Sequence, residues 1–186
     1  MYVGLAHAVV AKLNVADDTY SEKVVLGEAI GLDIEPQYKE AEKYGDNKQI
    51  SKRKRFKNAK VSLETSTIPL AGQTTLFGHK TDTSKQEIVY NVNDNNNYVG
   101  LGVYVTEEVD GVDKYSAMFM YKVKFAEGKE AYETEGDSIT YQTPSIDGEA
   151  LGNTAGNWRK RKQFDTEAAA IAWIDSMIAG TEAASK

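Results

Sequence analysis

Apolar and polar residues alternate along most of the chain, and this period of two residues predicts β-strands. Three consecutive segments show the alternation most clearly: residues 98–109, 115–125 and 138–146. In the second segment, Phe119 and Phe125 fall on one face, whereas Lys122 and Lys124 fall on the other. Asp110-Gly111, a residue pair typical of tight hairpin turns, separates the first segment from the second. The three segments therefore predict consecutive strands connected by hairpins.

The same pattern continues through the rest of the chain. Further strands are expected over residues 6–15, 23–26, 29–38, 59–67 and 87–92, with a short basic strand or extended arm at 158–164. Two helices are also expected. The first covers residues 69–78 and begins at a proline; the second begins at the capping residue Asp165, runs to about Ile178 and ends before Gly180. These elements predict a mainly β protein, a sandwich or barrel with one or two peripheral α-helices.

Four stretches lack the alternation. Residues 44–57 predict a long charged loop or a mobile hairpin, 127–137 an acidic loop, 148–157 a loop rich in Gly and Asn, and 181–186 a flexible tail. Long loops in compact domains are usually functional or disordered. The loop at 44–57 is therefore the first candidate for an interaction with a partner.

Composition restricts the chemistry that this chain can carry. Its 186 residues, 41% of them hydrophobic, are enough for one domain over residues 1–186. The absence of cysteine excludes disulfides and thiolate metal sites. The two histidines, His7 and His79, lie far apart and have no nucleophile at a catalytic spacing. We therefore expect no catalytic residue, no metal and no cofactor, and an enzyme is the least favoured class.

Two further features of the sequence bear on nucleotide binding and on membrane insertion. Gly100 and Gly102 resemble part of a dinucleotide-binding fingerprint, but a strand continues after them, so they are expected to mark a bulge or a close approach of another backbone. No apolar run is long enough to cross a membrane, and the N-terminus lacks the pattern of a signal peptide. A soluble protein made and used without secretion is expected.

Charge is distributed unevenly, although the net charge is only −6. Basic residues gather in two segments, 52–60 and 159–162. Such segregation predicts either pairing between surfaces of identical copies or a nucleic-acid patch. In the second reading the cations would bind phosphates and Phe56 would stack on a base. The acidic balance of the whole chain favours the first reading, in which the basic segment is solvated or docks on an acidic surface of a neighbour.

Three separated motifs carry a resemblance to a known family. They are YVGLG at residues 98–102, YKVKFAEG at 121–128 and YETEGDSITYQTP at 132–144. In this order and with hairpin-sized gaps, they resemble the major tail proteins, or tail tube proteins, of long-tailed, siphovirus-type phages of Gram-positive bacteria. The rest of the chain is similar to this family more weakly.

The resemblance implies a structural virion protein. Members of this family have a tail-tube-type β-sandwich and assemble into hexameric rings, which stack into the tube through which DNA is ejected. One sheet lines the bore, a helix packs outside, and a long loop reaches the next ring. The implied partners are other copies of the chain, the tape measure protein, the baseplate or initiator and the tail terminator, with transient passage of DNA and no membrane. The implied location is the virion tail, assembled in the cytoplasm of the host bacterium.

Residue by residue, the resemblance implies two surfaces. The inter-ring loop would present Lys48, Lys52, Arg53, Lys54, Arg55, Phe56 and Lys57. The bore would be lined by Asp33, Glu35, Ser62, Glu64, Lys122, Lys124, Ser138, Thr140 and Gln142. Two lysines in an acidic bore either pair across strands with carboxylates or face elsewhere. The alternative is a β-sandwich module that binds carbohydrate or decorates a capsid, with some of the 11 tyrosines as a sugar platform and no polymerisation.

Overall fold

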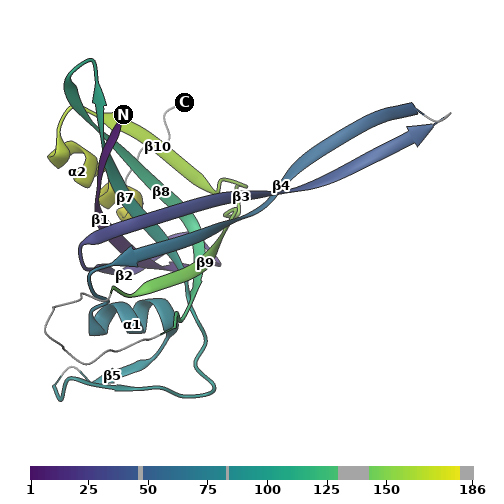
Figure 1. Ribbon diagram of the computed structural model, residues 1–186. Helices are drawn as coiled ribbons and strands as arrows, with labels where there is room; N and C mark the ends of the chain where they lie inside the picture. Colours follow the sequence, from purple (N-terminus) through teal and green to yellow (C-terminus); the bar gives the residue numbers. More distant parts are fainter. Residues whose placement is uncertain (46–47, 83, 130–142, 181–186) are drawn as a thin grey trace, which may run out of the picture.

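The computed structural model describes residues 1–45, 48–82, 84–129 and 143–180 (Figure 1). The strands are β1 (Tyr2–Asn14), β2 (Thr19–Val25), β3 (Ala29–Gly45), β4 (Lys48–Thr65), β5 (Lys80–Asp82), β6 (Glu87–Val89), β7 (Tyr98–Val109), β8 (Val112–Ala126), β9 (Ser145–Leu151) and β10 (Arg159–Phe164). The helices are α1 (Leu70–Phe77) and α2 (Glu167–Ala179). The prediction of a mainly β protein with two helices is confirmed.

Eight of these strands form a single antiparallel sheet. Its order is β2-β1-β7-β8-β9-β4-β3. β10 pairs with residues 115–120 of β8, and β9 pairs with residues 122–126 along the same edge. β5 and β6 make a separate hairpin. Within the described ranges the sheet is not closed into a barrel, so β2 and β3 each have only one strand neighbour. The Asp110-Gly111 turn between β7 and β8 is confirmed, with left-handed φ values of 51° and 78°.

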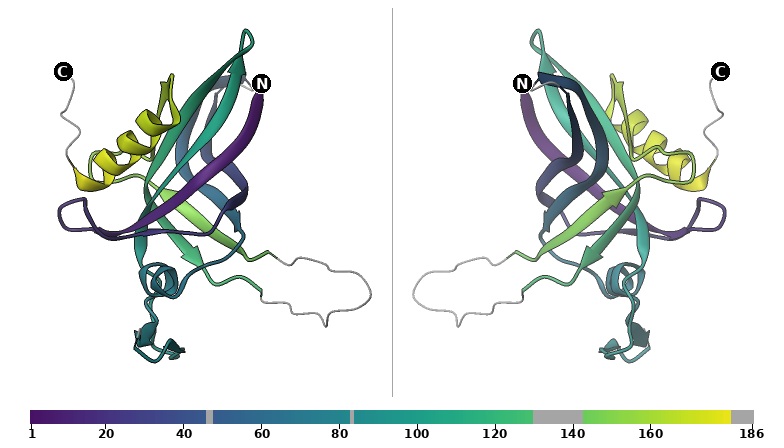
Figure 2. Two further views of the ribbon diagram at one scale, coloured as in Figure 1. Left: turned by 90° about the vertical axis from the view of Figure 1, so that its left-hand side faces the viewer. Right: turned by 90° about the vertical axis from the view of Figure 1, so that its right-hand side faces the viewer.

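The sheet curls around one core and carries a second core on its other face. The enclosed core combines side chains from β1, β4, β7, β8 and β9 with Leu76 and Phe77 of α1. The second core lies beneath α2, which lies against the outer face of the sheet (Figure 2). There, Trp173 and Ile174 pack with Val9 and Phe119 of the sheet. Both predicted helices are present. The cap of α2 is Thr166, not the predicted Asp165, since the Thr166 hydroxyl accepts a hydrogen bond from the backbone N–H of Ala169.

The two glycines of β7 allow the elements above them to approach closely. A Cβ on Gly102 would lie 2.3 Å from Cγ2 of Ile174, and a Cβ on Gly100 would lie 2.6 Å from the ring of Phe119. The pairing of β7 with β8 also shifts register between Val99 and Leu101. The expected bulge is therefore confirmed, whereas the groups that approach these glycines are side chains and not the expected backbone.

The prediction of a loop at residues 148–157 was wrong in its first four residues. A strand, β9, lies at Ser145–Leu151, so residues 148–151 belong to it. The loop was predicted there because glycine at position 148 is typical of a turn. A Cβ at this position would lie 2.6 Å from the backbone oxygen of Lys124, so the crowded strand requires glycine there. Residues 130–142, which hold most of the predicted acidic loop and of the predicted strand, lie outside the described residues.

Of the two predictions for residues 44–57, the hairpin is confirmed in the part that is described, and the irregular loop is wrong. β3 continues to Gly45, β4 begins at Lys48, and the two strands pair along their whole length. The apolar alternation disappears here because the hairpin leaves the core and has solvent on both faces. Opposite charges on paired strands take its place, a signal that hydrophobic periodicity cannot detect.

Candidate assembly surfaces

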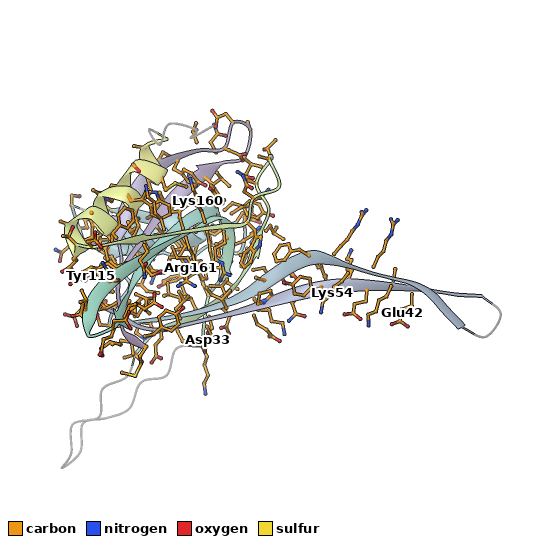
Figure 3. The ribbon with its side chains drawn as sticks, turned by 90° about the horizontal axis from the view of Figure 1, so that it is seen from above. Asp33, Glu42, Lys54, Tyr115, Lys160 and Arg161 are labelled. Carbon is orange, nitrogen blue, oxygen red and sulfur yellow. The ribbon has the colours of Figure 1, made fainter. Side chains whose placement is uncertain are left out.

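The end of the β3–β4 hairpin projects from the body of the protein as a long two-stranded ribbon (Figures 1 and 3). We call residues 38–45 and 48–57 the arm. Pairing between β4 and β9 stops at Ala59, so within the described chain the strand of the arm that belongs to β4 pairs only with β3. The arm therefore exposes an unpaired backbone edge on each side.

Alternation gives the arm two different faces. Cross-strand partners share a face, and one face carries Tyr38, Glu40, Glu42, Lys52, Lys54 and Phe56. On this face Nζ of Lys52 lies 2.9 Å from a carboxylate oxygen of Glu40 and 3.2 Å from one of Glu42, and Nζ of Lys54 lies 3.3 Å from Glu40. These contacts hold the pKa of Glu40 below its usual value and raise the pKa of Lys52. The charges of this face neutralise one another.

The opposite face of the arm is basic. It carries Lys39, Arg53 and Arg55, with Ala41 between them in the register. None of these three cations forms an ion pair with another described residue. The predicted loop residues therefore lie on two faces of the arm: Lys52, Lys54 and Phe56 on the neutralised face, and Arg53 and Arg55 on the basic face. Lys57 lies at an exposed bulge, and the side chain of Lys48 is outside the described part.

An aromatic stack joins the arm to the body. The rings of Phe56 and Trp158 stack at 4.9 Å, Tyr38 meets Phe56 edge-on at 6.2 Å, and Arg159 lies 4.5 Å from the centre of the Trp158 ring. Contacts of this kind are worth ~0.5–1.5 kcal/mol each beyond the buried area. The stack therefore ties both strands of the arm to the segment before β10.

The outer face of β3, β4, β9 and β8 forms a polar surface with a shallow hollow of about 700 Å³. Across β3, β4 and β9, Asp33 lies opposite Ser62, and Ser62 lies opposite Asp147. In β9, Glu149 lies opposite Lys60 of β4 on one side and Lys124 of β8 on the other. The register therefore brings six of the predicted bore residues to one face: Asp33, Glu35, Ser62, Glu64, Lys122 and Lys124. Ser138, Thr140 and Gln142 lie outside the described residues.

Sequence reasoning missed two carboxylates of this face, Asp147 and Glu149. The alternation from Ile146 to Ala150 could have revealed them, since Ile146 and Ala150 are buried on the opposite face. Glu149 lies in the segment expected to form a loop, and Asp147 lies between that segment and the expected strand, so neither was assigned to a strand face. With them, carboxylates outnumber lysines on the polar face.

The two predicted bore lysines are held by an aromatic ring. Nζ of Lys122 and Nζ of Lys124 lie 4.6 Å and 5.2 Å from the centre of the Tyr98 ring. Cation–π attraction of this kind contributes ~0.5–1 kcal/mol at exposed sites. The expected pairing with carboxylates is not seen for these lysines among the described side chains, whereas Lys60 does lie 3.8 Å from Glu35. Both lysines nevertheless belong to the polar face.

A separate polar cluster surrounds His79, which is 5% exposed. Its Nδ1 lies 2.8 Å from a carboxylate oxygen of Asp94, and its Nε2 contacts the carboxylate of Glu127. The hydrogen bond from His79 lowers the pKa of Asp94. The cluster ties the segment after α1, the loop before β7 and the end of β8 together. Only the tertiary structure brings these carboxylates to the histidine.

The described residues form neither a metal site nor a membrane-spanning helix. Among the residues with described positions, no group of three or more His, Asp or Glu is arranged to hold a metal ion. No described helix has the length and apolar character needed to cross a membrane. Comparison of the chain with models of protein families and with curated proteins gives no match.

Proposed function

We propose that this chain is a structural virion protein, the major tail (tail tube) protein of a siphovirus-type phage. In this proposal it has a tail-tube-type β-sandwich and self-assembles into stacked, hexameric rings that form the conduit for DNA ejection. The resemblance of residues 98–102, 121–128 and 132–144 to that family suggests the class. The arm is the structural observation that supports it most strongly.

The arm supports self-assembly because it is poorly stabilised by its own chain. An isolated two-stranded hairpin is marginal in water, and unpaired strand edges are prone to associate with other chains. The arm has both features, and the sheet ends in two edge strands, β2 and β3. A neighbouring copy that covers these surfaces would remove the cost of their exposure. Such a head-to-tail contact generates a ring when the rotation between copies closes.

The polar face supports the role of conduit. A bore through which DNA slides must not bind phosphates firmly, because each phosphate that a lysine or arginine neutralises adds affinity through counterion release. The polar face carries more carboxylates than lysines, and it provides a surface suited to the lumen. The proposed partners are further copies, the tape measure protein, the baseplate or initiator and the tail terminator. The proposed location is the virion tail, after assembly in the host cytoplasm.

Electron microscopy of the purified protein over a range of concentrations tests the proposal. Rings or tubes are expected for the wild-type chain. A matched variant replaces residues 40–54 by an Asn-Gly turn, which shortens the arm at the facing pair Glu40 and Lys54. It should keep the thermal unfolding of the body and form no tubes. Dispersed wild-type particles at every concentration would instead support the non-polymerising binding module.

A further inference from the structure

The end of the protein opposite the arm carries an exposed apolar patch. We call this surface the tip patch. It comprises the first residues of β1 and the β7–β8 turn: Met1, Tyr2, Val3, Val109 and Val112. Their exposed fractions range from 40% for Val109 to 80% for Met1. The amino group of Met1 donates to the backbone oxygen of Glu108 at 2.8 Å, and the backbone N–H of Glu108 donates to the oxygen of Met1 at 2.8 Å. The patch is therefore held in an ordered strand pairing.

The register divides the tip patch between two faces: Glu108 and Asp113 share one face with Met1, whereas Val109 and Val112 lie on the other. Glu108, Asp110 and Asp113 are exposed, and Glu108 lies directly opposite Asp113 in the β7–β8 register. None of the three carboxylates forms an ion pair with a residue that the structure describes. The adjacent Lys114 pairs with Asp165, and its charge is therefore already matched. The face of the tip patch that carries Met1 thus combines an exposed apolar side chain with unpaired negative charge.

We propose that the basic face of the arm of one copy docks on the tip patch of a neighbouring copy. This inference rests on the proposed function and deepens it, because it names the surface that receives the arm. Three cations without ion pairs on the arm, Lys39, Arg53 and Arg55, face three carboxylates without ion pairs on the tip. Complementary charge of this kind sets orientation and partner choice. Burial of Met1, which shares the face of Glu108 and Asp113, supplies the apolar part of the contact.

The positions of the two surfaces make the contact intermolecular. The arm projects from one side of the molecule, whereas the N-terminus and the β7–β8 turn lie on the other (Figure 1). One copy therefore cannot cover its own tip patch with its own arm. Each copy offers one arm and one tip patch, so the contact is heterologous and produces a closed ring or a growing chain.

A second exposed apolar surface, on the β5–β6 hairpin, fits the arm less well. It exposes Val89 and Val92. Its charged side chains are of both signs: Lys80, Asp82, Lys85 and Glu87. Lys85 and Asp82 lie 3.5 Å apart, so part of this charge is already matched. Without an excess of negative charge, this hairpin lacks the feature that selects a basic partner.

Reversing the charges separately on the two surfaces tests the inference. The arm variant is Arg53→Glu with Arg55→Glu, and the tip variant is Glu108→Lys with Asp113→Lys. Each variant alone should raise the protein concentration needed for assembly by ~10-fold or more, since like charges then face each other. The matched control, Lys80→Glu with Lys85→Glu, makes the same change in net charge as the arm variant and should assemble like wild type. Unchanged melting temperatures establish that the variants fold.

Mixing the two variants provides the decisive measurement. In an equimolar mixture the reversed arm of one variant meets the reversed tip of the other, and the unchanged arm meets the unchanged tip. Assembly should therefore return to within ~3-fold of the wild-type concentration, with the two variants alternating. Sedimentation and electron microscopy at low salt report this directly. If wild type forms tubes but the mixture does not, the inference is overturned and the proposed function stands. If wild type itself stays dispersed, the proposed function fails as well.

Discussion

The packing of α2 over Gly102 allows a quantitative prediction for Gly102→Ala. The new Cβ would lie 2.3 Å from Cγ2 of Ile174 and 3.1 Å from Cγ1 of Val9. The first distance is ~1.2 Å shorter than an ordinary carbon–carbon contact of ~3.5 Å. The obstruction sits between a central strand and a helix whose Ile174 is fully buried, so neither element can move away freely.

Overpacking of this kind destabilises a core by ~1–3 kcal/mol. Replacing glycine in a strand partly offsets this by ~0.5–1 kcal/mol, because the unfolded chain loses freedom. We expect the free energy of unfolding to fall by ~1–2 kcal/mol, or the melting temperature by ~2–8 °C for a chain of this size. Urea unfolding followed by circular dichroism measures the change.

Two companion variants make this reasoning refutable. Gly4→Ala is the control, because a Cβ there has no atom within 4 Å among the described residues, and it should change stability by less than ~0.5 kcal/mol. Ile174→Ala removes the obstructing methyl group. The double variant with Gly102→Ala should be more stable than the sum of the two single effects by ~0.5–3 kcal/mol. Additive effects, or a Gly102→Ala protein as stable as the control, would show that the helix does not rest on this glycine.

Three further predictions follow from separate contacts. Burial and the nearby Glu167 raise the pKa of Tyr104 to about 12, so the stability it contributes is complete below pH ~10 and is lost as pH rises towards 12. Tyr104→Phe should flatten this part of the stability profile, and identical profiles would exclude Tyr104 as its source. Trp158→Ala removes the ring stacked on Phe56 and should make trypsin cleave the arm faster while the body stays resistant; unchanged cleavage would mean that the stack does not anchor the arm. Lysine at three carboxylates of the polar face should leave tubes intact but slow DNA ejection, with recovery at high salt. Those positions are Asp33, Glu35 and Glu64. Tubes that fail to form would place these side chains in an interface.

The sequence by itself determined the turns, helix ends and strand faces, because these depend on residues that are close together along the chain. The Asp110-Gly111 turn was predictable because two residues in the left-handed region favour this pair. The second helix was predictable because its apolar stripe packs on the sheet and Gly180 ends it with a φ of 66°. Alternation in β3, β4 and β8 also placed six predicted bore residues on one face, since a strand has a fixed period of two.

Other features depend on which strands become neighbours, and only the tertiary structure decided these. The arm was not predictable from apolar periodicity, because its strands stabilise each other through Glu40, Lys52 and Lys54 across a pairing that the sequence does not specify. Sequence alone suggested a turn at Gly148. In the structure this glycine lies within a strand, because the backbone of the neighbouring strand leaves no room for a side chain.

For the arm and the tip patch as well, the sequence identified the charged residues and the tertiary structure decided how they are grouped. Sequence alone gave the basic residues of segment 52–60 but not their separation into a neutralised face and a basic face. That separation required the register with β3, which brings carboxylates to one side only. Sequence likewise listed Glu108 and Asp113 without distinction from other acids. The chain's tertiary fold decided that they share a face with the exposed Met1 at the end of the molecule away from the arm, because strand pairing fixes positions that local residue preferences leave open.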